Sequence, residues 1–303
     1  MGKRVTVLVT GGTGLIGRAL CPLLTANGYD VRLLSRAAGL NGKYRSYHWN
    51  VENGEMDFQA LDGADHIIHL AGANIGEKRW TEARKALIRS SRTDAATLLA
   101  AAVSKYPGKI KTFLGASAVG YYGAHTSAHI FTEADPPASD FLGTTCAQWE
   151  ASSLVFEELG CRRVLLRTGV VLSREGGIIP ALKPMVKWGM GAVAGTGSQY
   201  LPWIHIEDLC RLYLFALRTS GLHGAFNAVA PEDTDYRTFI HTMARIMGRR
   251  ILLPAIPGSI LKVLLGEMSQ MVLYGSRVSA SLVMEAGFAF NLPVLSDALG
   301  SEL

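Results

Sequence analysis

Cys146 and Glu150 are four positions apart in TTCAQWEASS, inside a segment that we predict to be helical from Cys146 to Leu159. This spacing puts a thiol and a carboxylate on one helical face, where both could take part in proton transfer. A thiolate is favoured by a nearby positive charge, whereas Glu150 is negative and is expected to raise the pKa of Cys146. Two interpretations stay open: Glu150 is a general base, or the two residues are a buried helix position and a structural hydrogen-bond acceptor.

Other side chains that can exchange protons are associated with predicted strands. Tyr121 and Tyr122 follow an apolar segment, and either phenol could donate a proton or a hydrogen bond. His205 lies in PWIHIEDL, and histidine is the residue type that most often transfers protons near neutral pH. For His205, a purely structural role is the alternative.

A glycine-rich segment near the N-terminus, TGGTGLIG at 10–17, lies between an apolar strand and an amphipathic helix. In this context Gly11 permits a tight turn, Gly14 lets the backbone approach a pyrophosphate, and Gly17 lets the helix pack closely on the strand. The N-terminus of a helix also attracts anions. The segment therefore predicts a dinucleotide site, with a glycine-rich turn that binds no ligand as the alternative.

The end of the next predicted strand indicates which dinucleotide binds. A cofactor without a 2′-phosphate is usually met there by Asp or Glu, which accepts a hydrogen bond from the ribose. This chain has Ser35 and Arg36 instead, and an arginine can pair with a 2′-phosphate. Asp30 precedes the strand and lies at the wrong end. We therefore expect NADP(H), with Arg36 as an ordinary solvated charge as the alternative.

These motifs resemble those of the extended short-chain dehydrogenase/reductase family, which includes nucleotide-sugar epimerases and dehydratases. The resembling segments, in family order over residues 1–230, are TGGTGLIG, the HLAG that ends a predicted strand, SAVGYYG, RTGV and PWIHIEDL. More narrowly, HLAGANI, SAVGYYG, FNAVAP and the tail around 266–288 resemble an atypical epimerase-like subfamily. The C-terminal segment of that subfamily is a domain of unknown function.

The resemblance implies an NADP(H) site divided among four segments. The implied residues are, for the pyrophosphate, Gly11, Thr13, Gly14, Leu15, Ile16 and Gly17; for the adenosine phosphate, Ser35 and Arg36; for the ribose, Leu70, Ala71 and Gly72; and for the nicotinamide end, Thr168, Gly169 and Val170. Arg92 is a further phosphate candidate, with a solvated surface charge as the alternative. The resemblance also implies that His205 lies on the substrate side and that Arg277 binds an anionic group of the substrate.

The chain departs from the family at the residues that do the chemistry. Active members carry a Tyr whose proton is exchanged with the substrate, a Lys four positions later, and a Ser or Thr that steadies the substrate. We assign the Tyr and Lys positions to Cys146 and Glu150, and Glu150 could bind the nicotinamide ribose in place of Lys. The steadying position falls on Ala118, with Ser117 beside it. The candidate catalytic residues are Ser117, Tyr121, Tyr122, Cys146 and Glu150.

Short apolar segments alternate with helical ones through the first two-thirds of the chain. The predicted strands are Val5 to Val9, Val31 to Leu34, His66 to Leu70, Thr112 to Gly115 and Val164 to Arg167, and a further long helix is predicted from Ala83 to Val103. Such alternation is typical of a parallel sheet with helices on both faces. We predict an α/β fold: a Rossmann-type doubly wound parallel sheet with a small, mostly helical C-terminal lobe on the substrate side.

We assign residues 1–172 and 199–230 to the dinucleotide-binding domain, and residues 173–198 and 231–303 to the lobe. The glycines between 176 and 197 predict a loop over a ligand cleft. Helical segments punctuated by prolines dominate after residue 231. This organisation predicts a lobe packed on the sheet domain rather than a detachable domain.

Composition limits the classes of partner. Although the net charge is +5, the basic residues are dispersed among 303 positions, so nucleic acid is not expected. No apolar run approaches the roughly 20 residues of a spanning helix, and we expect a cytoplasmic protein without membrane contact. The spacing of the four cysteines suggests neither disulfides nor a metal site. A homodimer is the expected assembly, if any.

The sequence thus favours an NADP(H)-dependent oxidoreductase or epimerase-like enzyme that acts on a small hydroxyl or carbonyl compound. The alternative is a non-catalytic NADP(H) sensor or regulatory binding protein, which the altered Tyr and Lys positions favour. The substrate itself is not indicated, because the family resemblance covers the cofactor site better than the lobe.

Overall fold

The computed structural model describes residues 4–41, 43–106, 109–251 and 253–303. Over these residues the main sheet has nine strands in the order β13-β9-β7-β6-β1-β2-β4-β3, with β5 paired to β4. The strands are β1 (Thr6–Thr10), β2 (Asp30–Ser35), β3 (Gly39–Asn41), β4 (Tyr44–Asn50), β5 (Glu55–Met56), β6 (His66–His69), β7 (Thr112–Ala118), β9 (Arg162–Thr168) and β13 (Gly224–Ala228). The pairings from β13 to β4 are all parallel, as predicted for a doubly wound sheet.

The strand order reverses direction at β1, which lies between β2 and β6. Val7 pairs with Val31 of β2 on one side and with His66 of β6 on the other. All five residues of β1 are buried, which explains why its sequence is apolar without alternation. The carboxyl ends of β1 and β6 form the switch point at which doubly wound sheets bind their ligands. The glycine-rich segment begins at this point.

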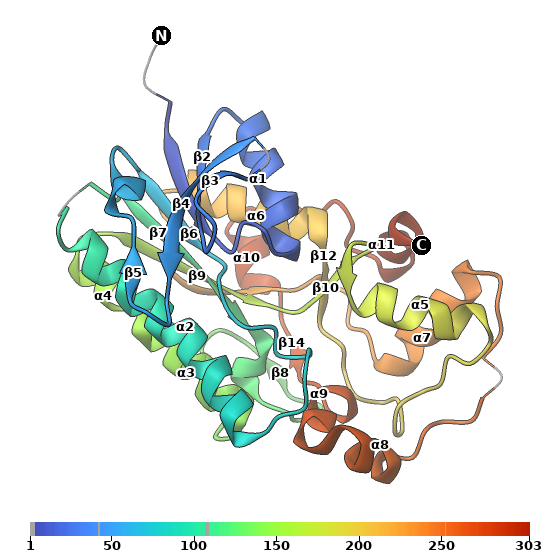
Figure 1. The fold of residues 1–303 in the computed structure, drawn as a ribbon. Coiled ribbons are helices and arrows are strands. Elements are labelled where there is room, and N and C mark those ends of the chain that lie inside the picture. The colour runs from blue at the N-terminus through green and yellow to red at the C-terminus, as the bar shows by residue number, and fades with distance from the viewer. Residues whose placement is uncertain (1–3, 42, 107–108, 252) are drawn as a thin grey trace.

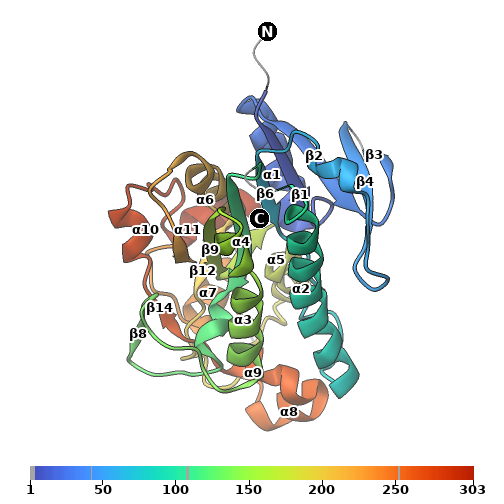
Figure 2. The ribbon, with the colours of Figure 1, turned by 90° about the vertical axis from the view of Figure 1, so that its left-hand side faces the viewer.

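Helices cover both faces of the main sheet (Figures 1 and 2). On one face, α1 (Leu15–Ala26) packs against α6 (Ile206–Arg218) over a core that includes Leu24 and Leu209. On the other face lie α2 (Glu82–Val103), α3 (Phe141–Ser152) and α4 (Val155–Glu158). The predicted helix from residue 83 is confirmed. The predicted helix from Cys146 begins earlier, because Asp140 caps α3 by accepting from the Gly143 N–H, and it is divided at Ser153.

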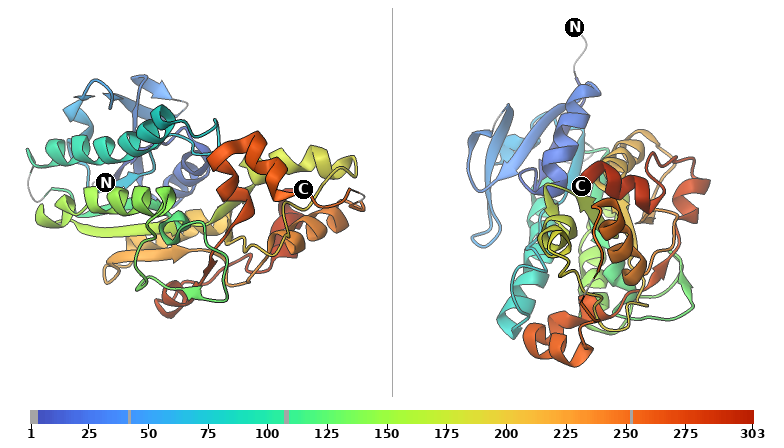
Figure 3. Two further views of the ribbon diagram at one scale, coloured as in Figure 1. Left: turned by 90° about the horizontal axis from the view of Figure 1, so that it is seen from below. Right: turned by 90° about the vertical axis from the view of Figure 1, so that its right-hand side faces the viewer.

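A second core forms the lobe beside the main sheet. It contains a small sheet of β11 (Gly176–Gly177), β10 (Val170–Ser173) and β12 (Trp203–His205), which packs with α5 (Ile178–Lys187), α7 (Tyr236–Ile246) and α11 (Leu295–Glu302). The remaining elements are the strand pair β8 (Ile130–Phe131) and β14 (Arg277–Val278), the helices α8 (Gly258–Leu265), α9 (Gln270–Leu273) and α10 (Ser281–Glu285), and the 3-10 turns η1 (Phe58–Leu61), η2 (Val119–Tyr122) and η3 (Gly266–Ser269). Figure 3 shows the orange to red C-terminal segments gathered on the side away from the blue N-terminal strands.

The structure differs from the sequence prediction in three places. The glycine-rich range 176–197 contains α5 as well as loop, because Ile179 and Val186 bury one helical face in the lobe core. Leu172 and Trp203 also join the lobe core, although both lie inside the ranges assigned to the dinucleotide domain. Strands β3 to β5, β8 and β10 to β14 were not predicted. In the part of the chain that the structure describes, no helix is long and apolar enough to cross a membrane.

Two histidines of β6 should make folding stability depend on pH. Burial lowers the pKa of both His66 and His69 to about 4, so between that pH and 6.5 the unfolded chain binds more protons than the folded one. Stability is therefore complete above pH 6.5 and decreases as pH falls. We expect urea unfolding to show roughly 1–2 kcal/mol less stability per histidine near pH 5 than near pH 7.5. His66→Gln with His69→Gln should flatten this dependence, whereas a change of the exposed His223 to Gln should not.

Candidate functional site

The glycine loop has the shape that binds a pyrophosphate. Gly11 has φ +68°, and a Cβ there would lie 2.8 Å from the carbonyl carbon of Leu70. A Cβ on Gly17 would lie 2.5 Å from the Gly11 carbonyl oxygen, so the helix could not approach the loop. Gly14 is the N-cap of α1, and its own N–H donates to Gly11 O at 3.0 Å. The exposed anion site is therefore the first turn of α1, where the backbone N–H groups of residues 15–17 have no partner within the helix.

The end of β6 forms the neighbouring wall. The N–H groups of Leu70 and Ala71 both donate to Thr10 Oγ1 at 3.2 Å. A Cβ on Gly72 would meet the Arg92 side chain at 3.3 Å. Arg92 is fixed in place, because it donates to the carbonyls of Ile88 and Ala73 and lies 4.8 Å from the centre of the Trp149 ring system. It is a half-buried wall of the candidate site, and burial lowers its pKa, so the alternative of a solvated surface charge is wrong.

The segment predicted to bind the adenosine phosphate lies at the carboxyl end of β2. Arg36 is exposed, and its carbonyl accepts from His48 Nδ1 at 3.1 Å. His48 Nε2 lies 3.1 Å from Glu55, and the hydrogen bond to Glu55 and that to Arg36 raise the pKa of His48. The turn is closed by the Ser35 hydroxyl, which accepts from Ala37 N–H. Arg36 is thereby held at the rim of the site, and no carboxylate ends β2, because Asp30 begins it.

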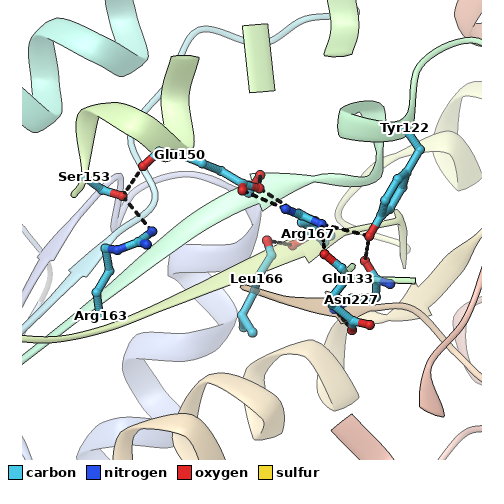
Figure 4. Close-up of polar contacts among 10 residues, drawn as sticks. Tyr122, Glu133, Glu150, Ser153, Arg163, Leu166, Arg167 and Asn227 are labelled. Carbon is cyan, nitrogen blue, oxygen red and sulfur yellow. Dashed lines mark hydrogen bonds and ion pairs between the residues drawn. The ribbon is translucent and has the colours of Figure 1, made fainter. Parts of the chain in front are cut away.

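Glu150 forms a buried ion pair with Arg167 of β9 (Figure 4). Arg167 Nε and Nη2 donate to the two carboxylate oxygens at 2.8 and 2.9 Å, and the Ser117 hydroxyl donates to Oε1 at 2.6 Å. Burial opposes the charge of Arg167, but the hydrogen bonds to Glu150, the charge of Glu150 and the contact with Tyr122 together outweigh it and raise the pKa of Arg167. The charge of Glu150 is compensated by Arg167, and its carboxylate accepts three hydrogen bonds. The geometry therefore argues against Glu150 as a general base.

The ion pair of Glu150 with Arg167 belongs to a hydrogen-bond network that extends across the sheet (Figure 4). Arg167 Nη1 donates to the Tyr122 hydroxyl at 3.0 Å, and that hydroxyl donates to Asn227 Oδ1 at 2.7 Å. The Asn227 N–H donates to Glu133, and its side-chain amide donates to the Ser279 carbonyl. Tyr122 is 1% exposed, and burial raises its pKa to about 12. The candidate role of Tyr122 as proton donor to a substrate is therefore wrong, since its proton is used inside the protein.

Cys146 is buried and is no nucleophile in this structure. Burial, followed by the charge of Glu150, raises the pKa of Cys146 to about 12, so the predicted effect of Glu150 on the thiol is confirmed. The side chains of Leu142 and Cys146 both face Gly120, while Glu150 continues the same helical row. None of the 12 residues of α3 is Tyr or Lys, so this helix carries no Tyr–Lys pair.

Tyr121 lies beside the predicted nicotinamide end. It belongs to η2, directly after β7, and Ala118 at the end of β7 pairs with Thr168 at the end of β9. The Tyr121 ring is partly exposed and covers Arg167, whose guanidinium carbon is 3.5 Å from the ring centre. Gly169 and Val170 follow Thr168, where the chain enters the lobe. Their backbone N–H groups donate to the carbonyl oxygens of Ala228 and Pro202, respectively.

His205 has a structural position. Its Nδ1 accepts from Glu207 N–H and so caps α6, and its Nε2 lies 3.0 Å from Glu302 Oε1 and 3.2 Å from Ser301 Oγ. With 4% of its surface exposed and both nitrogens engaged, His205 does not face a substrate, which corrects the proposed substrate-side role. Arg277 is paired with Asp233 at 2.7 Å, which raises its pKa, and lines a small cavity with Tyr200. An anionic group would have to compete with Asp233 for Arg277.

Sequence reasoning missed the role of Arg167, although the residue begins the RTGV motif. An arginine in the otherwise apolar strand segment VLLRT is a signal that a buried partner exists. Asn227 and Glu133 gave no comparable signal. The sequence indicates Thr10 only as part of the glycine motif, although its hydroxyl accepts hydrogen bonds from two backbone N–H groups of the ribose segment.

Glu150→Gln should destabilise the protein strongly. The change keeps the shape but removes the charge that compensates the buried Arg167, a loss that typically costs about 3–5 kcal/mol. Glu157→Gln is the matched control, since Glu157 forms an exposed ion pair with Arg163 and should cost less than about 1 kcal/mol. Urea unfolding measures both. Equal effects of the two changes would show that the Glu150 pair is not a structural requirement.

Comparisons with known proteins agree with this geometry. The chain matches the model of the NAD dependent epimerase/dehydratase family over residues 7–228, and that of a domain of unknown function, DUF1731, over residues 256–302. It is 36% identical to the epimerase family protein YfhF of Bacillus subtilis over 296 residues, covering 97% of each chain. It is 33% identical to the human epimerase family protein SDR39U1 over 296 residues, covering 97% of this chain and 98% of the human one.

Solved structures give the same result. The crystal structure of human SDR39U1 with NADPH matches with a TM-score of 0.88 at 32% identity, and the match covers 98% of each chain. The UDP-glucose 4-epimerase of Thermotoga maritima matches with a TM-score of 0.79 at 20% identity, over 98% of this chain and 96% of that one, and shows the fold alone. The chain therefore belongs to the NAD dependent epimerase/dehydratase family.

Proposed function

We propose that the protein binds NADP(H) across the carboxyl ends of β1, β2 and β6. The observation that carries this proposal is the pairing of a tight glycine loop at the N-terminus of α1 with an exposed arginine, Arg36, where a carboxylate would select the cofactor without a 2′-phosphate. The glycine contacts with β6 leave room for backbone but not for side chains. The crystal structure of the human relative SDR39U1 with NADPH also supports the proposal.

The proposed reaction is hydride exchange with a small hydroxyl or carbonyl compound, in the manner of an oxidoreductase or epimerase. A bound nicotinamide would supply or accept the hydride, and the protein would supply position and a proton. The buried states of Cys146 and Tyr122 and the ion pair of Glu150 leave Tyr121 as the candidate proton donor. Its ring covers Arg167, so a negative charge that develops on the phenol oxygen would lie close to a fixed cation.

A non-catalytic NADP(H) sensor is the second candidate, and one observation favours it. The hydrogen-bond network leads from Ser117 through Arg167 to Asn227, and from Asn227 to the Ser279 carbonyl after β14. It therefore connects the strand ends next to the cofactor site with the C-terminal segment. A protein that reports cofactor occupancy through the lobe needs such a connection and needs no proton donor.

Arg36→Ala should remove a preference for NADPH over NADH. In the unchanged protein NADPH should bind at least about tenfold more tightly, because Arg36 pairs with the 2′-phosphate. Arg45→Ala is the matched control: Arg45 is an exposed arginine on β4, where it covers Tyr47. Titration of cofactor fluorescence gives both dissociation constants. Equal binding of the two cofactors by the unchanged protein would contradict the choice of NADP(H).

Tyr121→Phe should abolish turnover if the protein is an enzyme. Oxidation of NADPH with a panel of small aldehydes, ketones and keto sugars should fall by about 100-fold or more, which is typical of a lost proton donor. Tyr122→Phe removes the same atom from a buried tyrosine and should lower stability while leaving turnover within about tenfold. Tight NADPH binding without turnover of any compound would favour the sensor, and equal losses in the two variants would remove Tyr121 from the chemistry.

A further inference from the structure

Thr10 and His69 join the ends of β1 and β6 beneath the proposed cofactor site. Thr10 Oγ1 and His69 Nδ1 are 2.8 Å apart, and both residues are at most 1% exposed. Thr10 is the last residue of β1 and His69 the last of β6, and their backbones are paired in the sheet. The glycine loop begins directly after Thr10, and the Leu70–Gly72 segment directly after His69.

The direction of this hydrogen bond follows from the neighbours of Thr10. Thr10 Oγ1 already accepts from the N–H groups of Leu70 and Ala71, at 3.2 Å each, and the Leu70 N–H is shared with the Thr10 carbonyl oxygen, also at 3.2 Å. A hydroxyl has one proton, and the acceptor available to it is His69 Nδ1. Nδ1 therefore carries a lone pair, and the ring is the tautomer with its proton on Nε2. Burial, with a smaller effect of Arg92, lowers the pKa of His69 to about 4, so the ring is neutral near pH 7.

An imidazole at this position lowers the stability of the fold relative to an apolar side chain. His69 Nε2 is buried and has no hydrogen-bond partner among the described residues. The ring lies between Trp49 and Phe113, with ring centres 6.3 and 6.0 Å away, where an apolar side chain would avoid the cost of an unpaired N–H. The property that distinguishes His69 from an aromatic residue here is the acceptor at Nδ1.

We infer that Thr10 and His69 are positioning residues for the dinucleotide. His69 holds the Thr10 hydroxyl in the one orientation in which Oγ1 accepts from both amides of the ribose segment. This contact fixes the backbone of Leu70 and Ala71 against Gly11, where a Cβ would lie 2.8 Å from Leu70 C. The distance between the glycine loop and the ribose wall is thereby set before a cofactor arrives, which lowers the entropy lost on binding. The inference rests on the proposed binding of NADP(H).

Two substitutions of His69 separate the acceptor from the ring. The amide oxygen of Asn can take the place of Nδ1, whereas the amide of Gln reaches the place of Nε2 and leaves Nδ1 empty. We expect His69→Gln to weaken NADPH binding about tenfold or more, and His69→Asn to stay within about threefold of the unchanged protein. His66→Gln is the control, because His66 lies on the same strand at the end away from the site and should leave binding unchanged.

Substitutions of Thr10 test the same hydrogen bond independently of His69. Thr10→Val keeps the shape without the hydroxyl, and Thr10→Ser keeps the hydroxyl. Valine should weaken NADPH binding as much as His69→Gln does, serine should retain binding, and the combination of Thr10→Val with His69→Gln should cost no more than either change alone. In nitrogen-15 NMR spectra of the protein without cofactor, His69 should show an unprotonated Nδ1 and a protonated Nε2, and Thr10→Val should shift the Nδ1 signal.

The outcomes are distinct. If His69→Gln and Thr10→Val lower the unfolding midpoint but bind NADPH as the unchanged protein does, the two residues only pack the core and the inference is overturned. If NMR places the proton on Nδ1, the assigned hydrogen bond is wrong. If the unchanged protein does not bind NADPH, the proposed function fails and the positioning role fails with it, whatever the tautomer. If binding follows the acceptor, with Asn and Ser tolerated and Gln and Val not, the inference stands.

Discussion

The buried charge of Arg167 is the constraint on which the proposed catalytic half of the site depends. An arginine that is 4% exposed must have its charge compensated and its N–H groups paired, or the fold loses several kcal/mol. Glu150 supplies the charge and accepts from Nε and Nη2, and the Tyr122 hydroxyl and the Glu133 carbonyl accept from Nη1. Each of these partners is then held in a hydrogen bond with Arg167. The same contacts that stabilise Arg167 therefore remove Glu150 and Tyr122 from the set of groups that could exchange a proton with a substrate.

The cofactor half depends on backbone rather than on charge. Gly11 and Gly17 allow the loop, α1 and the end of β6 to approach within van der Waals distance, and no side-chain chemistry is needed for that. Such a site tolerates changes elsewhere, because its shape is set by local turns and by the sheet register. It follows that the shape of the cofactor site does not depend on whether α3 carries a Tyr and a Lys, which it does not in this chain.

The sequence predicted the parts of the protein that local rules determine. Buried strands such as β1, the glycine loop, the long helix α2 and Ser35 with Arg36 at the end of β2 all depend on residues close to one another in the chain. The network around Arg167 could not be predicted in the same way, since Tyr122 meets Asn227 across 105 positions and Arg167 meets Glu150 across 17. His205 shows the same limit: its partner Glu302 is 97 positions away, so the sequence could not distinguish a helix cap from a catalytic base. Strands β3 and β5 have only three and two residues, and β4, although seven residues long, is rich in polar side chains, so these strands carry little of the apolar pattern that marks a buried strand.

Both halves of the site use one device, a polar contact at the carboxyl end of a strand, but with different consequences. Between β1 and β6, the neutral contact of Thr10 with His69 orders backbone and leaves the adjacent amides and glycines to define a binding surface. At the end of β9, the charged contact of Arg167 with Glu150 leaves a cation whose exposed neighbour is the Tyr121 ring. A neutral contact can only position a ligand, whereas a fixed cation can also stabilise charge that develops during a reaction. Whatever chemistry the protein performs on a substrate should therefore occur at the carboxyl end of β9, beside Tyr121.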